Sequence, residues 1–322
     1  MFKPFLNVID YIIFKTNYFE MLPTPLQEIN SQLTEIKQLQ LFIKREDLNH
    51  PTIQGNKFRK LKYNLASAKT KKYKKILTFG GAFSNHIYAV AAAGKAFGFN
   101  TIGVIRGERV EPLNPTLQFA EANGMQLHFV SRSAYRNKDQ SEFIQGLKAK
   151  FGDFFLVPEG GSNILAVKGC AEIVGEIDLN YDYICSAVGT GGTLAGLITG
   201  ANNHGKILGF PALKGGDFLQ NEIVNLLGEN AKNYQNWELI TDYHFGGYAK
   251  FKPELIDFIN NCKKQFQIPL EPIYTSKMLF GIFDLIEKDF FEKGTTIVAI
   301  HTGGLQGIDG FNRRFGNLIS SL

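Results

Sequence analysis

Residues 183–200 read Tyr-Ile-Cys-Ser-Ala-Val-Gly-Thr-Gly-Gly-Thr-Leu-Ala-Gly-Leu-Ile-Thr-Gly. The apolar run at 183–187 predicts a buried strand, and the residues from 193 to 200 begin a helix. A glycine-rich turn at 189–193 joins the two. A strand that leads through such a turn into a helix is the repeating unit of an α/β fold with parallel strands.

The same alternation extends along the chain in both directions. Strands are expected at residues 41–44, 75–79, 101–105, 127–130, 154–157, 183–187, 207–210, 237–241 and 296–300, and helices at 84–97, 115–123, 141–151, 167–177, 193–200, 218–227, 253–266 and 276–291. A chain of 322 residues can bury a large core and favours two lobes. No glycine- or proline-rich linker divides it, so the lobe boundary must lie in ordinary loops.

The composition is that of an ordinary globular protein. Hydrophobic residues make up 44% and charged residues 20% of the chain, and the formal net charge is +5. The densest basic run, residues 69–75, is interpreted as a solvated connection between a helix and a strand. It lacks the interleaved aromatic residues of a nucleic-acid-binding surface. No nucleic-acid partner is therefore expected.

The first residues and the cysteines indicate a cellular location. The segment 5–14 is apolar, but it is short, is broken by Asp10 and lacks a basic lead and a cleavage site. No membrane partner is expected, and residues 1–20 are interpreted as an added or dispensable extension. The three cysteines have no short metal-ligand spacing and no secretory context. We therefore expect no metal site and a reduced, cytoplasmic protein.

The turn Gly189-Thr190-Gly191-Gly192-Thr193 has the features of an anion site. Glycines permit positive φ and expose backbone N–H groups, and the helix that follows adds the positive end of its dipole. Thr190 and Thr193 can add hydroxyl donors. The turn lacks both the Gly-Lys-Ser/Thr ending of a P-loop and the spaced Gly-x-Gly-x-x-Gly of a dinucleotide site, so a single phosphate is the better guest. The alternative is a strand–helix turn whose glycines serve packing.

A second candidate is the lysine in Gln54-Gly55-Asn56-Lys57-Phe58-Arg59-Lys60-Leu61. Lys57 is expected on the first turn of a helix, close to the positive end of its dipole and beside Arg59 and Lys60. This setting lowers the pKa of the amine and gives the neutral form that a Schiff-base lysine needs. An isolated lysine is more often a solvated helix start. The candidate phosphate site at 189–193 favours the functional interpretation of Lys57. Together the two segments indicate pyridoxal 5'-phosphate.

Two further turns carry candidate ligand groups. In Gly80-Gly81-Ala82-Phe83-Ser84-Asn85-His86, Ser84 could be a helix N-cap. Asn85 and His86 would also lie near the carboxyl edge of the sheet, where open α/β sheets bind ligands, and a substrate carboxylate could accept hydrogen bonds from Ser84 and the local amides. After the last strand comes His301-Thr302-Gly303-Gly304, where Thr302 could hydrogen-bond a ring nitrogen. Each turn therefore has a structural and a functional interpretation.

Tyr274, just before a helix, and the turn at 158–163 are weaker candidates. Tyr274 by itself would most often be a packing residue. A phenol held near a cofactor or a lysine could instead act as an acid, base or nucleophile. The turn 158–163 resembles the other two strand–helix turns but is less specific.

Taken in order, these segments resemble the fold-type II pyridoxal-phosphate enzymes, and among them the 1-aminocyclopropane-1-carboxylate deaminase and D-cysteine desulfhydrase family. The resemblance covers roughly residues 22–312 and rests on 55–61, 84–86, 189–193, Tyr274 and 301–304. It implies two open, twisted, mostly parallel sheets flanked by helices, with the active site between two domains. The implied large domain comprises residues 1–60 and 175–322, and the small domain residues 61–174. A homodimer is also implied.

The resemblance assigns the cofactor-binding residues. Lys57 would form the internal aldimine and shuttle the α-proton of the substrate. Asn85 would bond the phenolic oxygen of the cofactor. Residues 189–193 would hold its phosphate.

The resemblance also assigns residues to the substrate. Ser84 would meet the carboxylate of a small amino acid, and Tyr274 would stand over the reacting carbon. Tyr248 falls where the family has a second active-site tyrosine, although its sequence context, Gly246-Gly247-Tyr248-Ala249-Lys250, departs from that of the family.

Thr275 favours one reaction within the family. In members that open a cyclopropane, the residue after the tyrosine is glutamate, which resembles a partner for the pyridine nitrogen. The hydroxyl of Thr275 cannot supply that charge, so the ring becomes a weaker electron sink. Elimination tolerates this because electrons leave with the β-substituent. We therefore expect β-elimination from an amino acid such as D-cysteine, which gives pyruvate, ammonia and hydrogen sulfide.

Three alternatives stay open. The first is 1-aminocyclopropane-1-carboxylate deamination, in which the ring opens to 2-oxobutanoate and ammonia and Tyr274 acts at the ring carbon. The second is the elimination of water from serine or threonine. The third is a non-catalytic pyridoxal-phosphate-binding protein, against which the presence of Lys57, Ser84 and Tyr274 argues.

Overall fold

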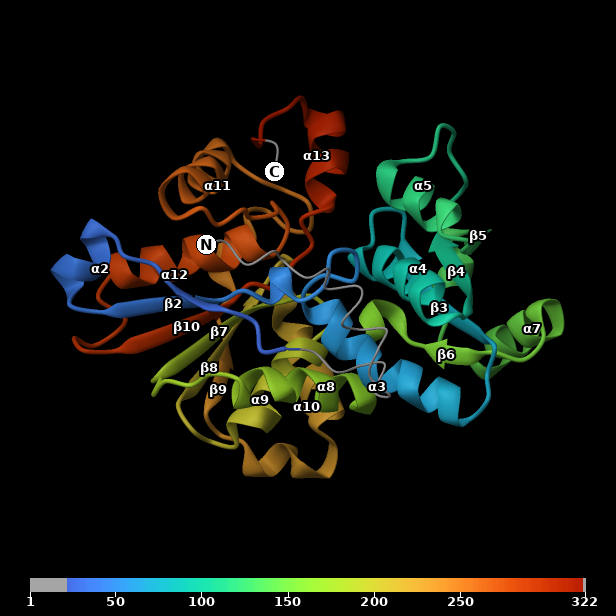
Figure 1. Cartoon of the computed structure of the whole chain (residues 1–322), viewed down its shortest axis with the longest axis horizontal. Coiled ribbons are helices and arrows are strands. Elements are labelled where there is room, and N and C mark those ends of the chain that lie inside the picture. The colour runs from blue at the N-terminus through green and yellow to red at the C-terminus, as the bar shows by residue number, and fades with distance from the viewer. Residues whose placement is uncertain (1–21, 321–322) are drawn as a thin grey trace, which may run out of the picture.

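The computed structural model describes residues 22–320 and contains two sheets that lie side by side (Figure 1). The larger sheet has the strand order β1-β2-β10-β7-β8-β9, and the smaller has the order β5-β4-β3-β6. Neighbouring strands are parallel except for β1 and β2. The expected α/β fold with two open, mostly parallel sheets is confirmed. The proposed extension at residues 1–20 lies outside the described residues.

The strands follow the expected order along the chain. They are β1 (Leu26–Glu28), β2 (Gln40–Lys44), β3 (Lys75–Gly81), β4 (Asn100–Arg106), β5 (Gln126–Val130), β6 (Phe155–Val157), β7 (Tyr183–Val188), β8 (Lys206–Pro211), β9 (Trp237–Leu239) and β10 (Thr296–Ile300). Of these, only the short edge strand β1 has no counterpart among the expected strands.

Helices cover both sheets. The α-helices are α2 (Gln32–Lys37), α3 (Asn56–Thr70), α4 (Asn85–Phe97), α5 (Pro115–Ala122), α6 (Arg132–Tyr135), α7 (Ser141–Phe151), α8 (Ile164–Gly175), α9 (Gly192–Ala201), α10 (Leu219–Leu227), α11 (Pro253–Phe266), α12 (Thr275–Glu287) and α13 (Gly307–Phe315). Short 3-10 turns are η1 (Glu46–Leu48), η2 (Glu159–Gly161), η3 (Gly216–Phe218), η4 (Gly228–Asn233) and η5 (Asp242–His244). Helices α2, α6 and α13 were not expected from the sequence.

Strand β10 illustrates why the central strands are continuously apolar. Ile297, Val298, Ala299 and Ile300 are all fully buried. Ile297 and Ala299 pack into the core that contains α11 and α12, whereas Val298 and Ile300 pack into the core that contains α8 and α9. Successive side chains of a strand point to opposite faces. A strand that helices cover on both faces therefore has a continuous run of apolar residues and no alternation of apolar and polar residues.

Helices α3, α8 and α9 approach one another closely at glycines. A Cβ on Gly169 would lie 2.0 Å from the Arg59 carbonyl oxygen, and one on Gly196 would lie 2.4 Å from the Cβ of Cys170. The proposed domain limits place α8 in the small domain, although its buried side belongs to the core of the six-stranded sheet. The helices that join the two sheets are therefore tightly packed together.

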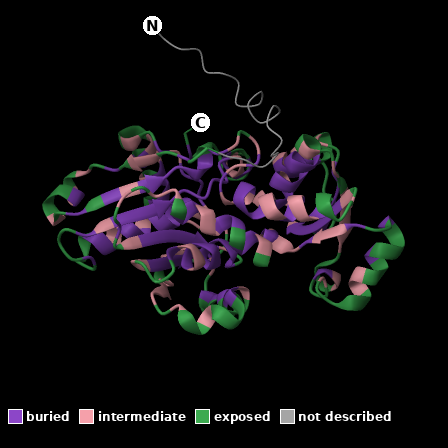
Figure 2. Cartoon of the chain, turned by 60° about the horizontal axis from the view of Figure 1, so that its bottom comes forward, coloured by how far each residue is buried: buried purple, intermediate pink, exposed green. Residues whose placement is uncertain are grey.

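Buried residues run along both sheets and the inner sides of the helices, and exposed residues cover the outer turns (Figure 2). The three cysteines are buried and form no disulfide. Within residues 22–320, no helix combines the length and the apolar character needed to cross a bilayer.

Candidate active site

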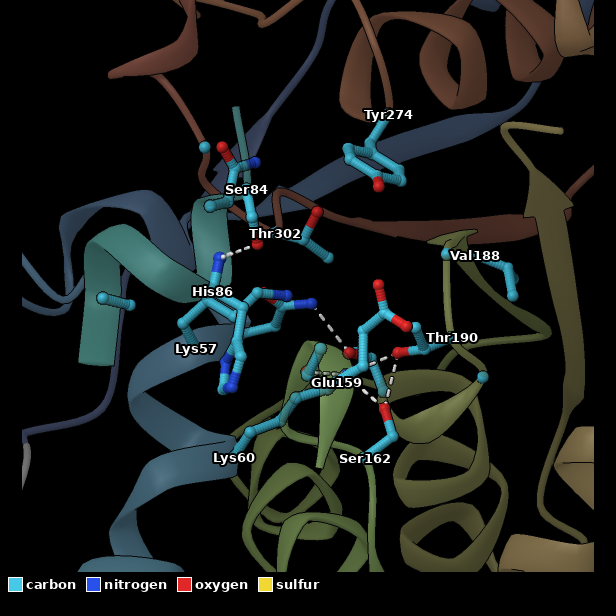
Figure 3. Close-up of a pocket in the computed structure, with 18 of the residues that line it drawn as sticks. Lys57, Lys60, Ser84, His86, Glu159, Ser162, Val188, Thr190, Tyr274 and Thr302 are labelled. Carbon is cyan, nitrogen blue, oxygen red and sulfur yellow. Dashed lines mark hydrogen bonds between the residues drawn. The ribbon is translucent and has the colours of Figure 1, made fainter. Parts of the chain in front are cut away.

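A cavity of about 890 Å³ opens where the carboxyl ends of β3, β7 and β10 face the start of α3 (Figure 3). The candidate residues that line it are Lys57, Ser84, Asn85, Gly189, Thr190, Gly191, Thr193, Tyr248, Tyr274 and Thr302. Gly192 is the exception and does not line the cavity, and a Cβ on it would lie 2.6 Å from Ser162 Oγ. The structure thus brings together residues that are far apart in the sequence.

Lys57 lies in the first turn of α3, directly against the segment that follows β10. Gly55 is the N-cap of this helix with φ of 69°, and a Cβ on it would lie 1.9 Å from the Thr302 carbonyl oxygen. The Asn56 N–H donates to the same oxygen at 3.2 Å. Lys57 Nζ donates to Asn56 Oδ1 at 3.3 Å, and Asn56 Nδ2 donates to Thr193 Oγ1 at 2.8 Å. These contacts hold Lys57 between two of the predicted ligand segments.

The amine of Lys57 is electrostatically unusual. Burial, and then the charge of Lys60, lower its pKa to about 7, against smaller opposing contributions from Cys170 and Glu271. The predicted direction is confirmed. The main cause is desolvation, which penalises the charged form, rather than the position at the helix start.

Arg59, the third basic side chain of the segment, points away from the cavity. Its guanidinium is buried and donates to both oxygens of Glu46 and both oxygens of Glu176 at 2.6 to 2.8 Å. Lys44 Nζ lies 3.1 Å from Glu176. The prediction that Arg59 helps to lower the pKa of Lys57 is therefore wrong, because carboxylates face its charge. The network instead fastens α3 to η1 and to the end of α8.

The reactivity of Lys57 should therefore change near pH 7. An amine reacts with an aldehyde only in its neutral form, and the neutral fraction rises as the pH passes the pKa. In the chain without added cofactor, reductive methylation of Lys57, followed by mass spectrometry, should reach half of its maximal rate near pH 7. The exposed Lys95 on α4 is the control. A Lys57 that reacts no earlier in the pH series than Lys95 would contradict the low pKa.

Lys60 lies one turn after Lys57, on the same side of α3, and is buried. Its Nζ donates to the Gly160 carbonyl oxygen at 3.1 Å, to Ser162 Oγ at 3.0 Å and to Thr190 Oγ1 at 3.5 Å. Burial lowers the pKa of Lys60 to about 8. Sequence reasoning missed Lys60 and Ser162 as groups of the cavity. The three-residue spacing from Lys57 is the signal that marks Lys60.

The glycine-rich turn has the geometry of an anion site. Gly191 is the N-cap of α9 with φ of 79°. A Cβ on Gly189 would approach the Tyr274 ring to 3.1 Å. A side chain at Gly189 would therefore press against the Tyr274 ring, and one at Gly191 would be strained by the positive φ. The start of α9, the hydroxyl of Thr190 and the amine of Lys60 converge on one place, which suits a phosphate.

Ser84 and Asn85 begin α4 at the edge of the cavity. Ser84 is the N-cap, and its Oγ accepts from the N–H of His86 at 3.2 Å and from that of Ile87 at 3.3 Å. The N-cap interpretation of Ser84 is confirmed, and the residue also lines the cavity. Asn85 Oδ1 accepts from Gln306 Nε2 at 2.7 Å, which joins α4 to the segment after β10.

Tyr248 and Tyr274 form a pair at the cavity. Their ring centroids are 6.1 Å apart in an edge-to-face arrangement. Burial raises the pKa of Tyr274 well above its usual value, so its phenol stays neutral. Lys277 Nζ donates to the carbonyl oxygens of His244 and Gly247 at 2.9 and 2.8 Å and thereby fixes the loop before Tyr248.

Thr302 lines the cavity, whereas Thr275 is absent from its lining. The backbone N–H and the hydroxyl of Thr275 contact Glu271 Oε1 at 2.6 and 3.3 Å. The Glu271 carboxylate also accepts the N–H groups of Ile273 and Tyr274 and so caps the start of α12. Glu271 was not predicted, although an acidic residue just ahead of a helix is its signal. A substitution of Thr275 would therefore first alter its contacts with Glu271, because Thr275 does not line the cavity.

The residues of the cavity fit pyridoxal phosphate. A neutral amine at Lys57 suits the aldehyde of the cofactor, and the glycine-rich turn beside the amine of Lys60 suits its phosphate. Asn85 and Thr302 line the same cavity and can hydrogen-bond a polar ring. The donor set therefore matches the cofactor indicated by the sequence.

Several known proteins are similar to this chain in sequence and in fold. The pattern of the pyridoxal-phosphate dependent enzyme family matches residues 19–303. A Pyrococcus horikoshii protein assigned to the 1-aminocyclopropane-1-carboxylate deaminases is 32% identical over 301 residues, which cover 89% of this chain and 92% of that protein. The Arabidopsis thaliana bifunctional D-cysteine desulfhydrase/1-aminocyclopropane-1-carboxylate deaminase is 30% identical over 315 residues, covering 89% and 77%.

A crystal structure of a 1-aminocyclopropane-1-carboxylate deaminase homologue superposes with a TM-score of 0.81 at 30% identity and covers 92% of this chain and 94% of the other. Both the sequence and the fold thus agree with the chemistry of the cavity. The chain belongs to the pyridoxal-phosphate-dependent enzymes, as a relative of the 1-aminocyclopropane-1-carboxylate deaminases and D-cysteine desulfhydrases.

Proposed function

We propose that the protein catalyses β-elimination from a small amino acid of the D-cysteine type and releases pyruvate, ammonia and hydrogen sulfide. The observation that carries this proposal is the hydroxyl of Thr302, which the segment after β10 presents to the cavity. The carboxylates among the described lining residues are Asp139, Glu159 and Glu222, which come from the α6–α7 connection, η2 and α10. Thr302 therefore offers a hydrogen bond without a negative charge.

The charge at this position bears on the choice of reaction. When bound, pyridoxal phosphate withdraws electrons from the α-carbon of the substrate, and a carboxylate beside its ring nitrogen strengthens that withdrawal. Thr302 supplies no such charge, which favours a reaction whose electrons depart with a leaving group. A thiol at the β-carbon is such a group, whereas a cyclopropane has none.

Lys57 and Ser84 have complementary roles in this proposal. Lys57, neutral above about pH 7, accepts the α-proton of the substrate. Ser84, the N-cap of α4, binds the carboxylate through its hydroxyl, since a helix N-terminus favours an anion. Asn85 and residues 189–193 hold the cofactor, although Gly192 does not itself line the cavity.

Tyr274 supports elimination rather than nucleophilic ring opening. Its raised pKa keeps the phenol protonated. A neutral phenol can donate a hydrogen bond near the reacting carbon, but it is a poor nucleophile. Tyr248 then orients Tyr274 in this proposal.

Tyr274→Phe should separate the two reactions. A thiolate leaves without much acid assistance, so sulfide release from D-cysteine should fall by less than about tenfold. If Tyr274 acts at the carbon of a cyclopropane, ring opening should fall by about 10²–10⁴-fold, the usual contribution of an acid or base. Rates of sulfide and 2-oxobutanoate formation measure both effects. Tyr243→Phe, outside the cavity lining, is the control. A loss of sulfide release in the larger range would contradict the donor role.

The direct test compares substrates on the cofactor-loaded protein. D-cysteine, L-cysteine and 1-aminocyclopropane-1-carboxylate are supplied in parallel, and sulfide, pyruvate and 2-oxobutanoate are measured. We expect sulfide and pyruvate in equal amounts from a cysteine enantiomer. Formation of 2-oxobutanoate alone would select the second candidate, 1-aminocyclopropane-1-carboxylate deamination, which the names of the relatives favour.

A homodimer and a cytoplasmic location complete the proposal. The homodimer rests on the family resemblance, and the location rests on the cysteine content of the sequence. Sedimentation of the cofactor-loaded protein tests the first, and fractionation of the source cells tests the second.

A further inference from the structure

His301 follows β10 directly, just ahead of Thr302, and its side chain is completely buried. The two ring nitrogens have different backbone partners. Nε2 lies 2.6 Å from the carbonyl oxygen of Pro269, which can only accept a hydrogen bond. Nδ1 accepts the N–H of Gly303 at 3.2 Å. The ring proton is therefore on Nε2, and the lone pair on Nδ1 holds the turn that carries Thr302.

Asp47 offers Nδ1 an alternative partner. Its Oδ1 lies 3.5 Å from Nδ1, and a hydrogen bond between them would need a proton on that nitrogen. Such a proton would face the N–H of Gly303, so the two contacts exclude each other. Arg45 already donates to both oxygens of Asp47, at 2.9 and 2.8 Å. The ring with its proton on Nε2 alone is thus the form that satisfies these groups.

The contact with His301 completes the anchoring of one peptide unit, between Thr302 and Gly303. The carbonyl oxygen of this unit accepts the N–H of Asn56, the first residue of α3, at 3.2 Å. Its N–H donates to His301 Nδ1. A peptide unit is planar, so partners on both of its polar groups fix its orientation. Gly303 and Gly304, with φ of 77° and 89°, would otherwise leave this turn much conformational freedom.

Thr302 depends on this anchoring for the direction of its side chain. It lines the cavity, and within residues 22–320 its hydroxyl has no hydrogen-bond partner that could orient it. A β-branched side chain has few rotamers, so the backbone largely decides where the hydroxyl points.

We propose that His301 is a positioning residue, which directs the Thr302 hydroxyl at the ring of the cofactor by holding the Gly303 N–H. This inference rests on the role proposed above for Thr302. The carbonyl oxygen of Pro269 holds the imidazole from the other side, in the segment that leads to α12 and Tyr274. His301 therefore links the backbone of two segments that line the cavity.

Two substitutions separate the two contacts of the ring. Asparagine places an oxygen where His301 has Nδ1 and keeps an acceptor for Gly303, whereas glutamine places an N–H where His301 has Nε2 and keeps a donor for Pro269. The Gly303 N–H should stay protected from hydrogen exchange in His301→Asn and lose its protection in His301→Gln. NMR of the full-length chain without cofactor measures this exchange. In the unmodified sequence, nitrogen-15 signals should show the His301 proton on Nε2.

Cofactor binding then reports the position of the Thr302 hydroxyl. Loss of one hydrogen bond weakens binding by about two- to tenfold, so His301→Gln should raise by this factor the pyridoxal phosphate concentration that half-saturates the lysine-linked absorbance. Thr302→Val, which removes the hydroxyl, should do the same. The double variant should bind no more weakly than Thr302→Val alone, because both changes remove the same contact. His301→Asn should bind like the unmodified chain, although urea unfolding should show both His301 variants to be less stable.

Several outcomes would overturn the role of His301. They are a His301 proton on Nδ1 in the unmodified chain, a Gly303 N–H that stays protected in His301→Gln, and normal cofactor binding by His301→Gln or by Thr302→Val. Equal weakening by asparagine and glutamine, or losses that add in the double variant, would also contradict it. None of these measurements uses a substrate. Absence of sulfide release alongside the expected results would therefore end the proposed elimination but not the role of His301.

Discussion

Lys57→Ala should remove both the attachment of the cofactor and catalysis. The variant lacks the amine that reacts with the cofactor aldehyde and, in the proposed mechanism, the base for the α-proton. Loss of a base alone costs about 10²–10⁴-fold, and loss of the covalent link adds to it, so elimination should fall by at least roughly 10³-fold. The visible absorbance of the lysine-linked cofactor should disappear as well. Absorbance spectra and sulfide release measure the two effects.

A matched control separates this loss from unfolding. Lys95→Ala removes an exposed lysine from α4 and should change neither readout. Small primary amines added to Lys57→Ala should restore part of the elimination rate, because they can supply a free amine within the cavity of about 890 Å³. If Lys57→Ala retains both the absorbance and sulfide release, Lys57 is not the cofactor lysine.

Gly55→Ala should be among the most destabilising single substitutions in the chain. The new Cβ would lie 1.9 Å from the Thr302 carbonyl oxygen, and φ at position 55 is 69°. Neither backbone can yield without separating α3 from the segment after β10. Left-handed strain costs about 1–3 kcal/mol and forced overpacking a similar amount, so the free energy of unfolding should fall by about 4 kcal/mol. Urea unfolding of the full-length chain measures this change.

Gly124→Ala isolates the backbone contribution. Gly124 has φ of 83°, but a Cβ there meets nothing within 4 Å. Its replacement should cost only the strain of about 1–3 kcal/mol. Equal losses for Gly55→Ala and Gly124→Ala would show that α3 can move away from Thr302. Gly55→Ala should also weaken the lysine-linked absorbance, since Lys57 is two residues away.

The long elements of the fold could be predicted from the sequence. The expected helix at 253–266 agrees with α11 (Pro253–Phe266), and the expected strand at 296–300 agrees with β10. Both have an unmistakable pattern, one amphipathic and one continuously apolar. Helix α2 has six residues and β1 three, which is too few to show a period. The expected helix at 276–291 ends four residues early, at Glu287.

Only those residues of the cavity that belong to local sequence motifs could be predicted. Lys57, Ser84 and residues 189–193 stand in recognisable turns, and the structure places them around one cavity. The contacts of Lys60 with Ser162 and of Arg59 with Glu176 join residues 102 and 117 positions apart. No local pattern encodes such pairings, because they depend on how α3 packs against α8 and the loop after β6.

The start of α3 also constrains how this chain can vary in length. Lys57 faces the cavity, Arg59 the buried carboxylates and Lys60 the loop after β6, all within one turn of helix. Each residue of an α-helix is rotated by about 100° from the one before it. A single inserted residue ahead of Lys57 would therefore turn all three side chains away from their partners together. The number of residues between Gly55 and Lys60 is therefore fixed by the contacts of all three side chains together.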